Sequence, residues 1–109
     1  MKEITVQELK QKFDNKEAFQ LIDVREVHEN EIANIGGELI PFGSILHQVD
    51  KISRDKEVIL YCRSGNRSGA AIQSLEKQHG FTNLFNLKGG ILAYAKDIDK
   101  SLPVFWLFK

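Results

Sequence analysis

The sequence is poor in cysteine and has no net charge, and both features exclude classes of function. Its 109 residues include one cysteine, Cys62, which excludes an internal disulfide, a Cys-x-x-Cys redox pair and a multi-cysteine zinc site within the chain. Fifteen basic residues balance fifteen acidic ones, so the overall charge offers no attraction to nucleic acid or to an anionic membrane. We therefore expect neither as a partner.

Long apolar runs are also missing. The first residues, MKEIT, form no apolar signal segment, and no run approaches the length that spans a bilayer, so the cytoplasm is the expected location. The length suits a single domain over residues 1–109. Residues 102–109 form an apolar tail, which is expected either to pack on the domain or to provide a contact patch for another chain.

Short apolar runs alternate with amphipathic segments along the chain. Strands are predicted at residues 4–5, 19–24, 38–40, 58–61 and 82–87. Helices are predicted from a capping box at Thr5 to Phe13, within 25–32, from a cap at Ser44 through Ile52, from Ser68 to His79 and at about 91–96. This alternation predicts an α/β fold in which helices cover both faces of a parallel sheet.

The single cysteine lies where a buried strand meets a turn and a helix, in the stretch VILYCRSGNRSGAAI that begins at residue 58. The turn and the helix start contain Arg63, Ser64, Gly65, Asn66, Arg67 and Ser68. Converging N–H groups, a helix dipole and two arginines all favour the thiolate, which is the reactive form of cysteine. Many free cysteines are small buried hydrophobes. The electropositive turn instead indicates that Cys62 is a nucleophile.

Other candidate residues follow strands in the same way. Asp23 ends the second predicted strand, and Gly89 and Gly90 follow the fifth. Because parallel α/β sheets bind ligands beyond the carboxyl ends of their strands, these residues and Cys62 are expected to share one rim.

A thiolate within a ring of N–H groups and arginines suits displacement at phosphorus or at sulfur. Cysteine-dependent phosphatases place five residues between the cysteine and the arginine, whereas four separate Cys62 from Arg67. The shorter ring does not meet the phosphatase spacing and suits a persulfide, whose charge the N–H groups would bind.

The chain resembles the single-domain rhodaneses, which are thiosulfate or persulfide sulfurtransferases. The resemblance covers residues 4–100 and rests on LIDVRE at 21–26, VILYCRSGNRS at 58–68 and NLKGG at 86–90. It implies a five-stranded parallel sheet with helices on both sides, no cofactor and no metal. It also implies that Cys62 carries the sulfur and that residues 63–67 cradle the persulfide.

Other residues near the loop are expected to have supporting roles, of which the resemblance implies that of Asp23 and Arg25. Asp23 and Arg25 are expected to form an ion pair or cap at the end of the second strand, and Gly89 and Gly90 to meet a backbone requirement beside the loop. Arg63 is expected to attract an anionic donor, and Arg67 to brace the loop. Two hydroxyls, those of Ser64 and Ser68, either donate to the sulfur or serve as turn and N-cap residues.

Two segments depart from the family pattern. NIGGE at 34–38 stands where the family usually has a His-Ile-Pro-Gly-Ala-like segment, and it resembles rhodanese domains fused to ubiquitin-like-protein-activating enzymes. Tyr94 stands in place of the usual tryptophan. The histidines, His28, His47 and His79, have no ligand-spaced partners and are expected to be solvated or at helix ends.

Three functions remain open from the sequence. The first is a sulfurtransferase that takes sulfur from thiosulfate or a persulfide and passes it to a thiol, cyanide or a protein. The second is a sulfur-carrier module that works only with a partner protein as donor or acceptor. The third, which the Cys62–Arg67 spacing disfavours, is a thiolate-based phosphatase or arsenate reductase.

Overall fold

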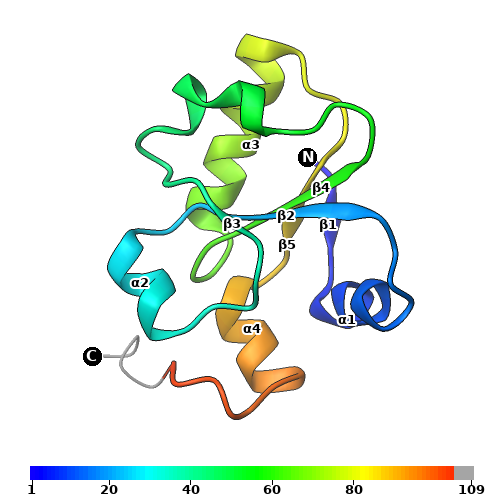
Figure 1. Ribbon diagram of the computed structural model, residues 1–109, viewed down its shortest axis with the longest axis vertical. Helices are drawn as coiled ribbons and strands as arrows, with labels where there is room; N and C mark the ends of the chain where they lie inside the picture. The colour runs from blue at the N-terminus through cyan, green and yellow to red at the C-terminus, as the bar shows by residue number, and fades with distance from the viewer. Residues whose placement is uncertain (105–109) are drawn as a thin grey trace.

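The computed structural model describes residues 1–104, which form one parallel sheet with helices on both faces (Figure 1). The strands are β1 (Glu3–Ile4), β2 (Phe19–Asp23), β3 (Glu38–Leu39), β4 (Glu57–Tyr61) and β5 (Leu84–Leu87). Their order in the sheet is β1-β5-β4-β2-β3, so β4 is central. The expected five-stranded parallel sheet is confirmed.

The α-helices are α1 (Val6–Asp14), α2 (Val27–Ile32), α3 (Asn66–His79) and α4 (Gly90–Asp97). Alternate residues of β4 point to opposite faces of the sheet, and both faces are buried. Leu60 packs in a cluster with Ile72 and Leu75 of α3, while Ile59 packs in another with Leu9 of α1 and Ile91 of α4. Burial of both faces explains the continuous apolar run before Cys62.

The prediction of one helix from Ser44 to Ile52 is wrong. The segment forms two 3₁₀ helices, Ile45–His47 and Val49–Lys51, because the backbone at Gln48 (φ −128°, ψ 32°) leaves the helical region between them. Ser44 is the N-cap residue of the first 3₁₀ helix, but its hydroxyl makes no capping hydrogen bond and instead donates to the Pro41 carbonyl oxygen at 3.2 Å. Ile45 and Ile52 are nevertheless buried against the α3 side of the sheet. The apolar spacing therefore predicted correctly which side chains are buried but not which type of helix carries them.

Smaller differences concern the ends of elements. The helix after Cys62 begins at Asn66, two residues before the predicted start, and Gly65 is its N-cap. Strand β5 begins at Leu84, two residues after the predicted start. The capping box of Thr5 and Glu8 is present as predicted, with the Glu8 N–H donating to the Thr5 hydroxyl at 3.1 Å.

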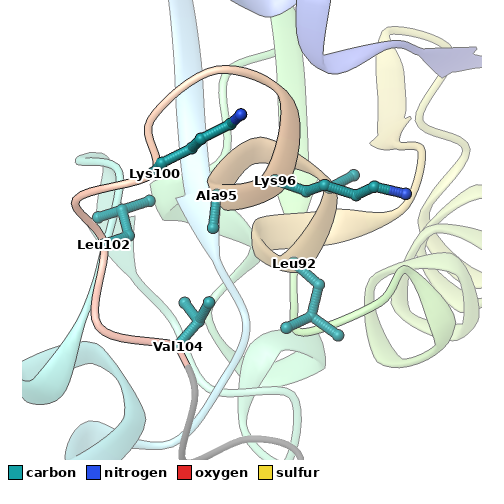
Figure 2. A pocket seen from close by; sticks show the side chains of 7 residues that line it. Leu92, Ala95, Lys96, Lys100, Leu102 and Val104 are labelled. Carbon is teal, nitrogen blue, oxygen red and sulfur yellow. The ribbon is translucent and has the colours of Figure 1, made fainter.

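The chain after α4 returns along that helix. Leu102 and Val104 pack against the cluster shared by α1 and α4, and the remainder of the predicted apolar tail, 105–109, lies outside the described residues. This segment and α4 enclose a hollow of about 390 Å³. Figure 2 shows side chains that line it; the lining residues are Leu92, Ala93, Ala95, Lys96, Lys100, Leu102 and Val104. The lining includes neither Cys62 nor residues 63–67.

Within residues 1–104, none of the helices combines the length and the apolar character that a membrane crossing requires.

Candidate active site

The sulfur of Cys62 lies at the carboxyl end of β4, where several donors converge on it. The residue follows Tyr61 directly and is 1% exposed. Its Sγ accepts hydrogen bonds from the Gly65 N–H at 3.2 Å, the Ser68 N–H at 3.5 Å and the Ser68 hydroxyl at 3.4 Å. Donors aimed at one atom stabilise negative charge there.

The turn after Cys62 directs backbone N–H groups inward. Gly65 has φ +106°, a conformation that glycine adopts without the strain a side chain would add. Ser68 is the third residue of α3, so its N–H is among the first four that lack an intrahelical acceptor. Gly65, not Ser68, is the N-cap, and both the hydroxyl and the N–H of Ser68 face the sulfur.

These contacts act on the ionisation of Cys62 against its burial. Burial alone would raise the pKa of the thiol. The hydrogen bonds from the Ser68 hydroxyl and from the N–H groups of Ser68, Gly65 and Ser64 outweigh burial and lower that pKa from its ordinary value. The lowered pKa favours the thiolate, which is the reactive form of cysteine.

Arg67 is held by a carboxylate from another helix. Its Nη1 and Nη2 donate to Oε1 and Oε2 of Glu29 on α2 at 2.8 and 2.9 Å. Glu29 is buried, and the bonds from Arg67 lower the pKa of its carboxyl to about 2. The Glu26 N–H also donates to Glu29 Oε1 at 3.0 Å. Arg67 thus joins the first turn of α3 to α2.

Asp23 and Arg25 form a fully buried ion pair at the end of β2. Arg25 Nε and Nη2 donate to the two Asp23 carboxylate oxygens at 2.9 and 2.8 Å, and Nη2 also donates to the Ala33 carbonyl oxygen at 2.6 Å. Asn30 of α2 donates to Asp23 Oδ2 at 3.0 Å. The pair ties the strand end to α2 and to the segment that follows it.

The double glycine lies against the backbone of the loop. A Cβ on Gly90 would be 2.4 Å from the Arg63 carbonyl oxygen, so a larger residue at position 90 would displace the loop. Just after it, the N–H groups of Ile91 and Leu92 donate to the carbonyl oxygens of Cys62 and Arg63 at 3.0 and 3.1 Å. Gly89 is the N-cap of α4. The start of α4 therefore binds the carbonyl side of the loop.

The remaining loop side chains lie at the surface. Arg63, Ser64 and Asn66 are exposed. His28 and His47 are exposed and His79 is half-buried at the end of α3. Among residues 1–104, no group of three or more His, Cys, Asp or Glu side chains is placed to hold a metal ion.

Sequence reasoning missed two residues of the site, Glu29 and Asn86. Asn86 of β5 is 3% exposed, accepts the Ser68 hydroxyl at 2.6 Å and donates to the Gly65 carbonyl oxygen at 3.1 Å. A visible signal existed for it, because it is the one polar residue in the strand LFNL, and a buried amide needs partners. Glu29 gave no comparable signal, since it is one of three glutamates in the polar segment 26–31.

Comparisons with known proteins place the chain in one family. Residues 5–97 match the family described as Rhodanese-like domain. The chain is 36% identical over 90 residues to a putative sulfur carrier protein, YrkF, of Bacillus subtilis, covering 82% of this chain and 48% of that protein. It is 35% identical over 106 residues to a probable adenylyltransferase/sulfurtransferase, MoeZ, of Mycobacterium tuberculosis, covering 94% of this chain and 26% of that protein. The chain thus spans less than half the length of either relative.

Two solved structures resemble this chain over most of its length. A rhodanese-related protein from Thermoplasma volcanium superposes with a TM-score of 0.79 at 26% identity, covering 90% of this chain and 94% of that one. A protein from Staphylococcus saprophyticus superposes with a TM-score of 0.78 at 31% identity, covering 94% and 98%. With the family match over residues 5–97, these likenesses show that the chain belongs to the rhodanese-like domain family.

Proposed function

We propose that this protein is a sulfurtransferase that carries a sulfane sulfur on Cys62 as a persulfide. The observation that carries the proposal is the convergence of the Gly65 N–H, the Ser68 N–H and the Ser68 hydroxyl on Cys62 Sγ. Membership of the rhodanese-like family and relatives named as a sulfur carrier and as a sulfurtransferase support it. The donor is thiosulfate or a persulfide, and the acceptor is a thiol, cyanide or a protein.

The proposed cycle consists of two displacements at sulfur. The Cys62 thiolate attacks the outer sulfur of thiosulfate, a new S–S bond forms, and the bond to the sulfonate sulfur breaks with its electron pair leaving on sulfite. An acceptor such as cyanide then attacks the terminal sulfur of the persulfide and departs as thiocyanate. The electron pair of the broken S–S bond returns to Cys62 Sγ, which restores the thiolate.

The surrounding residues support this cycle in different ways. Exposed Arg63 attracts an anionic donor, and Arg67 adds a cation that Glu29 holds in place. The side chains of Asp23 and Arg25 fix the neighbouring strand end, and Gly90 lets α4 approach the loop. No step of the cycle calls for a metal or an organic cofactor.

The phosphatase alternative gains no support from the loop. Four residues separate Cys62 from Arg67, one fewer than the phosphatase spacing. The carrier alternative keeps the same chemistry at Cys62 but takes its sulfur from, or passes it to, a partner protein only. The relative named as a putative sulfur carrier makes it the second candidate. The expected cytoplasmic location stays a prediction.

The test is the intact mass of the purified protein before and after incubation with thiosulfate, with Cys62→Ser as the control. We expect a gain of one sulfur atom that cyanide reverses and that the variant lacks. A gain only from a low-molecular-weight persulfide would favour the carrier module. Absence of sulfur uptake from either donor would refute sulfur transfer by Cys62.

A further inference from the structure

The hydroxyl of Ser68 has one proton and two acceptors in reach. Its Oγ lies 2.6 Å from Oδ1 of Asn86 and 3.4 Å from Sγ of Cys62. A serine hydroxyl donates a single hydrogen bond, so it cannot serve both acceptors fully at once. Ser68 and Asn86 are buried, at 0% and 3% exposed, so bulk solvent contributes little to relieving this competition.

The orientation of the Asn86 amide is set by its other end. Its Nδ2 donates to the Gly65 carbonyl oxygen at 3.1 Å, and a carbonyl oxygen can only accept. The Oδ1 atom is therefore directed at Ser68 and not at the loop. Pairing of Asn86 with Leu60 in the register of β5 and β4 fixes the backbone that carries the amide, one strand away from Cys62.

We propose that Asn86 is a positioning residue that competes with the sulfur of Cys62 for the Ser68 proton. The inference rests on the proposed function for its role in turnover. When Sγ is uncharged, as a thiol or as the inner sulfur of a persulfide, the proton lies on the short bond to Asn86. When Sγ is a thiolate, the hydroxyl turns to it and the bond to Asn86 is lost.

The competition leaves the thiolate less stabilised than its donors alone would make it. A thiolate with weaker stabilisation has a higher pKa and is a stronger nucleophile, because the nucleophilicity of a thiolate decreases when the pKa of its thiol decreases. Asn86 also gives the Ser68 hydroxyl an acceptor after sulfur is loaded and the charge has moved to the terminal atom. Asn86 thus keeps the thiolate nucleophilic for sulfur loading and gives the Ser68 hydroxyl a partner once the persulfide has formed, without contacting the reacting atoms.

Other charges near the sulfur are the same in all the variants used below. They are Arg63 in the loop, Arg67 on α3 with its partner Glu29 on α2, and the pair of Asp23 and Arg25 at the end of β2. The strand β5 and the first turn of α4, with sequences LFNL and GILA, carry no ionisable side chain. A change on replacing Asn86 therefore reports the hydrogen bonds and not a new charge.

The experiment measures the rate of alkylation by iodoacetamide against pH, which reports Cys62 alone because the chain has no other cysteine. Asn86→Leu removes the competing acceptor, and the Gly65 carbonyl oxygen keeps its bond from the Gly69 N–H at 3.0 Å. In this variant the Ser68 hydroxyl is free to donate to the thiolate, and a hydrogen bond to a charged group is stronger than one to a neutral group. We therefore expect the midpoint of the alkylation rate against pH to fall, so that the thiolate fraction at pH values below it rises about tenfold. The plateau rate above the midpoint should fall about threefold, because a less basic thiolate is less nucleophilic.

Ser68→Ala should shift the alkylation midpoint in the opposite direction and tests whether Asn86 acts through the Ser68 hydroxyl. It should raise the midpoint, and adding Asn86→Leu to it should change nothing, because Asn86 acts through the lost hydroxyl. Asn15→Leu, at the exposed end of α1, should behave like the wild type. Asn86→Ala removes the same acceptor if the leucine variant does not fold.

A raised or unchanged alkylation midpoint in Asn86→Leu would overturn the proposal. General disorder of the loop would weaken the hydrogen bonds to Sγ and raise the midpoint, whereas the proposed competition predicts that it falls. An equal shift in the Ser68→Ala background would overturn it as well. The alkylation profile requires no sulfur donor. Failure of sulfur uptake by the wild type would therefore be seen separately, in the mass measurement, and would not alter this result.

Discussion

Arg67 at the start of α3 and Glu29 on α2 lie 38 residues apart in sequence and are joined by two hydrogen bonds of 2.8 and 2.9 Å. This paired contact fixes the first turn of the helix whose N–H groups face Cys62. Bidentate pairing of arginine with a carboxylate adds geometric definition that a lysine would not supply.

The Glu29–Arg67 pair predicts a pH dependence of stability. Because Arg67 lowers the pKa of Glu29 from 4.5 to about 2, the pair stabilises the fold above pH 4.5, and this contribution is lost as pH falls towards 2. We expect Glu29→Gln to reduce the free energy of unfolding by about 1–2 kcal/mol at neutral pH, with the partial exposure of Arg67 limiting the effect. Urea unfolding at several pH values measures this, and the gap between variant and wild type should close in acid. A gap that stayed constant would contradict the assignment.

Gly90→Ala tests the close approach of α4 to the loop. A Cβ at position 90 would lie 2.4 Å from the Arg63 carbonyl oxygen, and the backbone there has φ +61°. We expect a loss of about 2–4 kcal/mol in stability together with slower sulfur loading, because the loop must move. Gly43→Ala is the matched control, since a Cβ there meets nothing within 4 Å. Thermal unfolding of both variants, with loading followed by mass, decides the point; equal behaviour would argue against the contact.

The buried pair of Asp23 and Arg25 should be far more important for stability than a surface pair. Asp23→Ala leaves a fully buried guanidinium without its carboxylate, which costs about 3–5 kcal/mol. The exposed pair of Lys10 and Asp14 on α1 provides the comparison, and Asp14→Ala should cost less than about 0.5 kcal/mol. Chemical denaturation of both variants measures the difference. Similar losses would show that burial does not govern the contribution of the Asp23–Arg25 pair.

Arg63 should affect the capture of donors according to their charge. Its side chain is exposed in the loop beside Cys62, so it should raise the rate at which dianionic thiosulfate arrives. We expect Arg63→Gln to slow loading from thiosulfate about tenfold at low ionic strength, with the difference shrinking as salt screens the charge. Initial rates of sulfur uptake at several salt concentrations test this. A loss that is independent of salt would point to a structural role for Arg63.

The sequence was most informative where burial dictates residue type. Apolar runs on both faces of β4 and turn residues after Cys62 were sufficient to predict a parallel sheet with the cysteine at its carboxyl rim. They could not distinguish an α-helix from two 3₁₀ helices at 45–51, because both bury Ile45 and the outcome depends on the backbone at Gln48. Nor could they pair Arg67 with Glu29, since only the folded chain brings α2 to the start of α3.

The loop is bound from opposite sides by two helices, and this arrangement has a consequence for variation among related chains. The first turn of α3 presents N–H groups to the sulfur, while the N–H groups at the start of α4 hold the loop carbonyl oxygens facing away from it. The polarity around Cys62 thus resides largely in peptide groups, which every amino acid carries. The exposed side chains at positions 63, 64 and 66 can therefore change without removing the peptide N–H groups that face the sulfur.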